Sequence, residues 1–329
     1  MQLESSKNND LEDIYKKISS VVPEIEWKVH APFIEKINKL KKEKNAVILA
    51  HNYQTPEIYH GVSDIAADSL ALAIEASKTT ADIIVLCGVH FMAETAKLMN
   101  PDKKVLIPDM QAGCSLASSI TGEDVRMLKE KYPGVPVVSY VNTSADVKAE
   151  TDICCTSANA VKVVESLGVD KVIFLPDHYL ANYVQKNTKV QIISWQGTCI
   201  VHEKFKAKEI DDIRKENPDI KIIAHPECPP DVISASDFAG STSGMSKYVK
   251  ENQPKKVLLV TECTMSDNVQ VENPNVNFIK PCNLCPYMKK ITLKKIYECL
   301  KYESNEIKIS HNIATMARKS VERMAEIGR

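Results

Sequence analysis

The stretch FIKPCNLCPYMKK, residues 278–290, contains two cysteines that are three positions apart, Cys282 and Cys285. Such a pair can be a metal clamp, a redox pair, or one ligand beside a bystander, and the stretch alone does not distinguish these. The chain contains 10 cysteines. We do not expect a disulfide framework among them, because a reducing cytosol disfavours one. Metal binding, catalysis and burial remain as their roles.

Three of the cysteines, Cys114, Cys199 and Cys285, occupy equivalent places in a repeated pattern. Each lies nine residues after a valine that opens a short apolar run; these valines are Val105, Val190 and Val276. Ligands bind beyond the carboxyl ends of parallel strands, so three equivalent loops would bring three thiolates to one point. Three thiolates without a fourth suit a zinc ion that keeps a water, or a [4Fe–4S] cluster with one iron that lacks a protein ligand.

The other cysteines have no such counterparts. The positions equivalent to Cys282 are Gln111 and Gln196, so we interpret Cys282 as a bystander, with a redox or spare-ligand role as the weaker alternative. The remaining cysteines, which we expect to be packing residues, are Cys87, Cys154, Cys155, Cys228, Cys263 and Cys299.

The elements that must position the thiols also repeat. Short runs rich in Val, Ile and Leu alternate with helical patterns, which predicts parallel sheets flanked by helices. Equivalent positions recur at steps of 85 to 89 residues. We therefore predict an α/β fold of three pseudo-threefold-related, three-layer α/β/α units around a central metal site. The predicted division is an N-terminal helical extension, three units and a C-terminal helical tail: 1–30, 31–120, 121–206, 207–290 and 291–329.

A polar pair follows the first strand of each unit. These pairs are His51 and Tyr53, Tyr140 and Asn142, and His225 and Glu227. Because the two members of a pair are two residues apart, both side chains can point to one face. Histidine, tyrosine and glutamate are the usual groups of general acid–base catalysis.

A hydroxyl residue marks the start of the next helix in each unit: Ser69, Ser157 and Thr242. We interpret these residues first as helix N-caps. Helix N-termini also bind phosphates and carboxylates through free backbone N–H groups. Three of them facing one centre would suit a small substrate with several negative charges.

Composition argues against several classes of protein. The chain of 329 residues has a formal net charge of -1 and no basic stripe, which argues against a nucleic-acid partner. Its apolar runs are too short to cross a bilayer, and its N-terminus lacks the apolar core of a signal peptide, so we expect a cytoplasmic protein. It has neither a dinucleotide-binding GxGxxG nor a P-loop.

Taken together, the motifs resemble those of quinolinate synthase, the NadA family. The matching segments are AHNYQ, GVHFMAETAK, QAGCSLA, YVNTSADVKAETD, CTSANA, SWQGTCIVHEKF, AHPEC, GSTSGM and CPYMKK, which run from about residue 45 to 290. The resemblance implies three α/β domains around a [4Fe–4S] cluster, held here by Cys114, Cys199 and Cys285. Some relatives carry a further cysteine where this chain has Ile279, so redox switching through that longer motif is not expected.

The resemblance also implies an activity. This is the condensation of iminoaspartate (iminosuccinate) with dihydroxyacetone phosphate to quinolinate, phosphate and water in de novo NAD biosynthesis, with the open iron as a Lewis acid. An upstream aspartate oxidase or dehydrogenase would supply the imine. The implied catalytic residues are Tyr53, His202, His225 and Glu227. The implied substrate-binding residues are His51, Ser69, Tyr140, Asn142, Ser157, His225, Glu227 and Thr242.

Three alternatives from other classes remain at this point. A zinc-dependent hydrolase could use the same three thiolates. An iron–sulfur sensor or electron carrier would need no acid–base residues around the iron. A purely structural triplicated scaffold leaves the matched cysteines unexplained.

Overall fold

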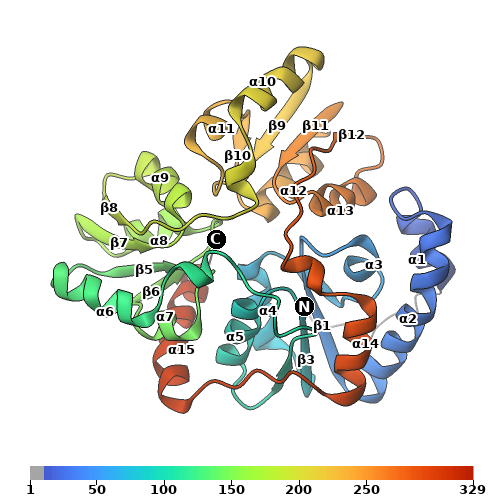
Figure 1. The fold of residues 1–329 in the computed structure, drawn as a ribbon, viewed down its shortest axis with the longest axis horizontal. Coiled ribbons are helices and arrows are strands. Elements are labelled where there is room, and N and C mark those ends of the chain that lie inside the picture. The colour runs from blue at the N-terminus through green and yellow to red at the C-terminus, as the bar shows by residue number, and fades with distance from the viewer. Residues whose placement is uncertain (1–10, 329) are drawn as a thin grey trace.

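The computed structural model describes residues 11–328, which contain three four-stranded parallel sheets (Figure 1). The strand orders are β2-β1-β3-β4, β6-β5-β7-β8 and β10-β9-β11-β12, so the three sheets share one topology. The strands are β1 (Ala46–His51), β2 (Ile65–Ala67), β3 (Ile83–Cys87), β4 (Lys104–Leu106), β5 (Val137–Tyr140), β6 (Ile153–Cys155), β7 (Lys171–Leu175), β8 (Gln191–Ser194), β9 (Ile220–Ala224), β10 (Phe238–Ala239), β11 (Lys256–Val260) and β12 (Asn277–Ile279). The predicted α/β fold of three repeated units is confirmed.

Helices alternate with these strands and cover the sheets. In Figure 1, the first sheet lies between α4 and α5 on one side and α2 and α14 on the other. The helices are α1 (Leu11–Ile18), α2 (Glu24–Glu43), α3 (Pro56–Tyr59), α4 (Ser69–Lys78), α5 (His90–Met99), α6 (Gly122–Lys131), α7 (Ala145–Ala149), α8 (Ala160–Ser166), α9 (His178–Asn187), α10 (Ala207–Glu216), α11 (Pro230–Ser234), α12 (Thr242–Asn252), α13 (Thr264–Glu272), α14 (Leu293–Tyr302) and α15 (His311–Ile327). None of the helices in residues 11–328 is long and apolar enough to cross a membrane.

Each sheet has an edge strand that the sequence pattern did not predict. These strands, β2, β6 and β10, contain only two or three residues, too few to show a period. A repeated hydrogen bond holds each one. The aspartate directly before the edge strand accepts a backbone N–H from the first strand of its unit at 2.8 Å: Asp64 from Ile48, Asp152 from Val137 and Asp237 from Ile222. This shared contact supports the triplication independently of the cysteines.

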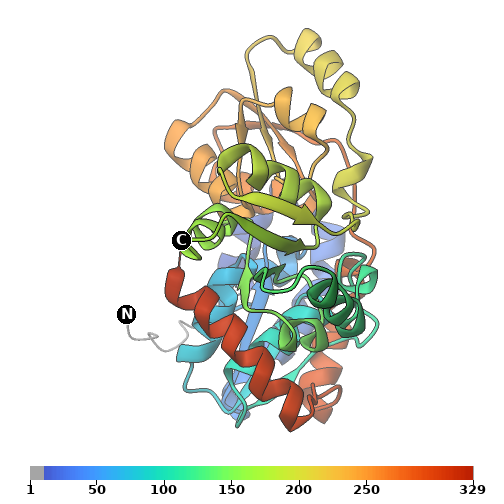
Figure 2. The ribbon, with the colours of Figure 1, turned by 90° about the vertical axis from the view of Figure 1, so that its left-hand side faces the viewer.

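The C-terminal helices pack on the outside of the first two units. Helix α14 contacts α2 and β3, and α15 contacts α5, α7 and β6. In Figure 2, α15 crosses the outer face of the molecule. Buried side chains of the first sheet, of one face of the second and of both helices form one apolar core, while the other face of the second sheet and the third sheet have smaller clusters of their own.

Candidate active site

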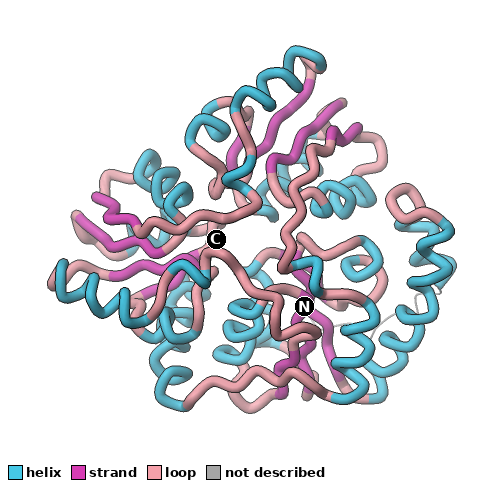
Figure 3. The backbone as a smooth tube through the Cα atoms, viewed as in Figure 1, coloured by secondary structure: helices cyan, strands magenta, loops and turns pink. Residues whose placement is uncertain are grey.

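A cavity lies where the three units meet, and Figure 3 shows their loops converging on the centre of the molecule. Every candidate residue predicted from the sequence lines it: His51, Tyr53, Ser69, Cys114, Tyr140, Asn142, Ser157, Cys199, His202, His225, Glu227, Thr242 and Cys285. Among the described residues 291–328, none lines the cavity, so the C-terminal tail does not close over it. The structure brings the predicted residues together, while their individual roles stay predictions.

The strand ends explain why the polar pairs meet. His51 and Tyr140 are the last residues of β1 and β5, and His225 directly follows β9. Each of them lies at the carboxyl edge of its own sheet, and the three sheets turn these edges towards the cavity. All three side chains are buried, and burial lowers the pKa of His51 to about 4.

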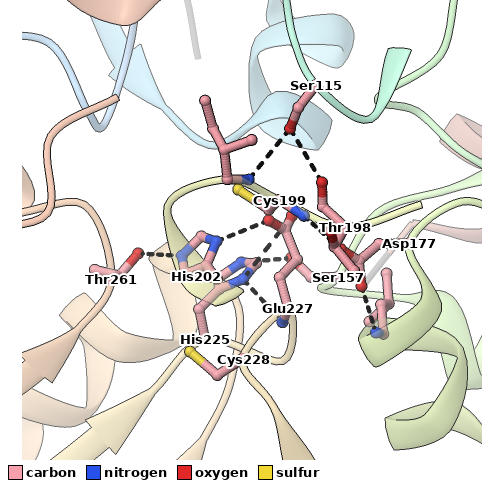
Figure 4. A network of polar contacts seen from close by, with 12 residues as sticks. Ser115, Ser157, Asp177, Thr198, Cys199, His202, His225, Glu227, Cys228 and Thr261 are labelled. Carbon is pink, nitrogen blue, oxygen red and sulfur yellow. Dashed lines mark hydrogen bonds and ion pairs between the residues drawn. The ribbon is translucent and has the colours of Figure 1, made fainter. Parts of the chain in front are cut away.

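Glu227 is the centre of a buried hydrogen-bond network (Figure 4). The Tyr140 hydroxyl donates to its Oε1 at 2.5 Å, and His202 Nδ1 lies 2.8 Å from its Oε2. A second contact between the same two units joins Ser157 Oγ to His225 Nε2 at 3.2 Å. The carboxylate therefore joins side chains from the second and third units.

Thr261, which belongs to none of the predicted polar pairs, extends this network. Its buried hydroxyl lies 2.6 Å from the Tyr53 hydroxyl and 2.9 Å from His202 Nε2. Hydrogen bonds thus run without interruption from Tyr53 through Thr261, His202 and Glu227 to Tyr140. Sequence reasoning missed Thr261, although its position directly after β11 was the available signal.

The electrostatics of the network keep Glu227 ionised. Burial penalises its charge, but attraction to His225 and His202 when these are protonated, and the hydrogen bonds from His202 and Tyr140 at any pH, hold the pKa of Glu227 below its usual range. Burial lowers the pKa of His225 to about 3, so its ring is neutral near neutral pH. Burial and the neighbouring Glu227 carboxylate raise the pKa of both Tyr53 and Tyr140. The cavity therefore contains the ionised Glu227 carboxylate beside two protonated phenols.

The three cysteine loops have the same local structure. In each, the carbonyl of the cysteine accepts the N–H of the residue four positions on, at 3.0 Å for Cys114 and Cys199 and 3.1 Å for Cys285. A short 3-10 turn begins three residues after each cysteine. The Ser115 hydroxyl joins two of the loops, because it donates to the Thr198 carbonyl at 3.1 Å.

This shared turn directs backbone N–H groups at each sulfur. The donors lie two and three residues after the cysteine: Leu116 and Ala117, Val201 and His202, and Tyr287 and Met288. Burial nevertheless raises the pKa of all three thiols, that of Cys114 to about 12. The sulfurs therefore remain protonated unless a metal centre replaces their protons.

A second set of ligands overlaps the first. Cys199, His202 and Glu227 each offer one ligand atom, and these three atoms lie within 4.8 Å of one another. Within residues 11–328, this is the only such group of three or more histidines, cysteines and acidic residues. A single metal ion could bind there, which the sequence did not predict.

The described residues contain one disulfide, which the sequence analysis did not predict. A disulfide joins Cys263, predicted as a packing residue, to Cys282, predicted as a bystander, with 5.0 Å between their Cα atoms. The two residues follow neighbouring strands, β11 and β12, and the Cys263 N–H donates to the Asn283 carbonyl. Sequence separation hides this proximity. The other cysteines predicted as packing residues are buried and free: Cys87, Cys154, Cys155, Cys228 and Cys299.

The three hydroxyl residues at the helix starts are not N-caps, contrary to the prediction. Ser69 and Thr242 are the first residues of α4 and α12, and the caps are Asp68 and Ser241. Helix α8 begins three residues after Ser157, at Ala160. Because the capping role is filled by other residues, these three hydroxyls are available to the cavity that they line.

Further residues line the cavity that sequence reasoning did not single out. They include Asp68, Phe91, Met92, Ser115, Thr156, Ile200, Tyr287 and Met288. Several of them lie within two or three residues of a predicted site residue, which was the signal for finding them.

The comparisons with known proteins agree on one family. The family described as "Quinolinate synthetase A protein" matches residues 35–326. The quinolinate synthase of Sinorhizobium medicae is 58% identical over 318 residues, which cover 97% of this chain and 89% of the relative. That of Agrobacterium fabrum is 57% identical over 326 residues (98% and 94%), and that of Xylella fastidiosa is 62% identical over 294 residues (89% and 87%). This chain therefore belongs to the NadA family of quinolinate synthases, enzymes of NAD biosynthesis.

Proposed function

We propose that this chain condenses iminoaspartate with dihydroxyacetone phosphate to give quinolinate, phosphate and water. Family membership supports the proposal, since its relatives are named quinolinate synthase. The observation that carries it is structural. One cysteine and one polar pair from each unit line a single cavity, which is the arrangement expected for a metal-assisted condensation of a small polar substrate.

The donor set favours a [4Fe–4S] cluster bound by Cys114, Cys199 and Cys285. Three soft sulfur ligands and backbone N–H groups aimed at them suit such a cluster. On a single zinc, tetrahedral thiolates lie only about 3.8 Å apart, whereas these three sulfurs do not form a group within 4.8 Å in the described part of the chain. When bound, the cluster would supply an iron without a protein ligand that polarises a substrate oxygen.

The overlapping group of Cys199, His202 and Glu227 supports a second candidate, a mononuclear metal centre. Its mixed sulfur, nitrogen and oxygen donors suit zinc. That site would leave Cys114 and Cys285 without a role, so we favour the cluster.

The walls of the cavity suit an anionic substrate. Ser69 and Thr242 begin α4 and α12, whose first-turn N–H groups favour carboxylate or phosphate. Asn142 and Ser157, both from the second unit, add hydrogen-bonding side chains to the cavity wall. We assign substrate binding to these residues together with His51, Tyr140, His225 and Glu227.

Proton transfer falls to the network around Glu227. Its ionised carboxylate accepts a proton, and the protonated phenol of Tyr53 donates one. His225 is neutral and buried beside Ser157, so one ring nitrogen can donate a hydrogen bond to substrate while the other accepts one. His202 fixes the carboxylate through its Nδ1.

The imine substrate implies a partner reaction. We expect an aspartate oxidase or dehydrogenase to supply it, and a cytoplasmic location for both enzymes. A four-iron cluster with an exposed iron suits the reducing conditions of that compartment.

A direct assay tests the function. Protein purified without oxygen is given dihydroxyacetone phosphate and iminoaspartate made in situ by aspartate oxidase, and quinolinate is quantified by chromatography. We expect quinolinate and phosphate in equal amounts from the wild type and none from Cys199→Ala. If cluster-loaded wild-type protein yields no quinolinate, the proposed function is wrong.

A further inference from the structure

Two buried carboxylates, Asp177 and Glu262, lie behind the cysteine loops of the second and third units. Each stands two residues past the end of an equivalent strand, β7 and β11. Both residues are 0% exposed, and neither lines the cavity. Burial and the nearby Glu227 carboxylate raise the pKa of Asp177, and a carboxyl group withdrawn from solvent is costly unless its oxygens accept hydrogen bonds.

In the second unit, the side chain of Asp177 is hydrogen-bonded to the backbone of the Cys199 loop. Its Oδ2 accepts the N–H of Cys199 at 3.2 Å (Figure 4). Its Oδ1 accepts the N–H of Leu180 at 2.8 Å and so caps α9. One rigid carboxylate therefore ties the cysteine backbone to the start of a helix.

In the third unit, Glu262 makes the equivalent contact. Its Oε1 accepts the N–H of Cys285 at 3.4 Å, and its Oε2 accepts the N–H of Thr264 at 2.9 Å, at the start of α13. Lys289 Nζ lies 3.3 Å from Oε1, which offsets the buried charge. An aspartate in the second unit and a glutamate in the third thus accept the same hydrogen bond from the cysteine N–H.

The first unit lacks this device, because Val89 stands two residues past the end of β3 and makes no side-chain hydrogen bond as the N-cap of α5. Instead, Ser115 beside Cys114 accepts the N–H of Ile200 and anchors the first loop to the second. The position of the Cys114 loop therefore depends on the Cys199 loop, which is hydrogen-bonded to Asp177.

We propose that Asp177 and Glu262 are positioning residues that fix the backbone of Cys199 and Cys285, so that both sulfurs are presented to an iron–sulfur cluster. The inference rests on the proposed cofactor. Partners that orient metal ligands typically contribute a factor of about 10 to 100 in metal retention. Neither residue touches the substrate, so each acts only through its cysteine.

Loss of the cluster to a chelator tests this role. The variants are Asp177→Asn and Glu262→Gln, which keep shape but replace one acceptor oxygen by an N–H donor, together with Asp177→Ala and Glu262→Ala. The matched control is Asp152→Asn, because Asp152 also accepts a backbone N–H in the second unit but far from any cysteine loop. Each protein is loaded without oxygen, and the decay of the cluster's visible absorbance is followed in 2,2′-bipyridyl.

We expect decay on the order of 10-fold faster in the four variants than in the wild type and the control. The electron paramagnetic resonance spectrum of the reduced cluster should also change, while Asp177→Asn, which still caps a helix, should keep the melting temperature of the cluster-free protein. A lower melting temperature with wild-type decay and spectrum would assign these carboxylates a structural role only and overturn the inference. If the wild type itself takes up no iron and sulfide, the proposed cofactor fails as well.

Discussion

Glu227 is the side chain through which the polar groups of different units interact. It accepts a hydrogen bond from Tyr140, contacts His202, and reaches Tyr53 through Thr261. Its lowered pKa keeps Glu227 ionised, whereas the raised pKa values of Tyr53 and Tyr140 keep both phenols protonated. Groups whose surroundings push their pKa values apart are the usual sign of an acid and a base in one site.

Replacing Glu227 by glutamine should abolish turnover but leave the metal centre in place. The amide keeps the size of the side chain and loses the proton-accepting charge, so we expect kcat to fall by about 100-fold or more. The assay is quinolinate formation by cluster-loaded Glu227→Gln at saturating substrate, with iron content as the control. Wild-type turnover in this variant would remove Glu227 from the mechanism.

Thr261 offers a sharper test of the network, since valine has nearly its shape. Thr261→Val removes the hydroxyl that holds both Tyr53 and His202, and we expect kcat to fall on the order of 10-fold with little change in KM. Thr261→Ser should restore most of the loss. Equal kinetics for the valine and serine variants would show that the hydroxyl is not used.

The elements around the site show what a sequence pattern can and cannot predict. The positions of Cys114, Cys199 and Cys285 followed from the strand register, because buried strands carry a recognisable apolar run. Strand β10, Phe238–Ala239, carries no period and was missed. The Cys263–Cys282 disulfide and the Thr261 hydrogen bonds depend on which loops adjoin in space, which spacing within the chain does not encode. The boundaries proposed for the units stay predictions.

Helix α14 is held to the first unit by a charged cluster whose strength should depend on pH. Glu303, just past its end, lies 2.6 Å from Lys104 Nζ and 2.5 Å from Lys44 Nζ. Hydrogen bonds from Lys104 and then Lys44 lower the pKa of Glu303 to about 2. Because the folded pKa is depressed, the stabilisation is present above the unfolded pKa of about 4.3 and is lost as the pH falls towards 2.

Glu303→Gln should therefore lower the free energy of unfolding near neutral pH by up to about 1 kcal/mol, since the pairs are partly exposed. The difference from wild type should shrink as the pH falls from about 5 towards 3. Urea denaturation at several pH values measures it. A difference that stays constant or grows towards low pH would contradict the ion-pair explanation.

At the scale of the whole molecule, no single unit contains the complete active site. The first two units and the C-terminal helices share one apolar core, the second unit has a further small cluster, and the third unit has only separate clusters. Helix α15 ties the first two together, because Arg318 donates to the Leu98 carbonyl and Arg323 to the Asp152 carbonyl. Each unit contributes one cysteine loop to the cavity, so only the assembled chain can present three thiols to one centre.

The central claim is that these three thiols bind an iron–sulfur cluster, and metal analysis tests it most directly. Protein purified without oxygen should contain about four iron and four sulfide per chain and no zinc. Cys114→Ala, Cys199→Ala and Cys285→Ala should each lose the cluster, and Cys282→Ala should retain it. Zinc without sulfide, or a cluster that survives the three ligand substitutions, would contradict the account.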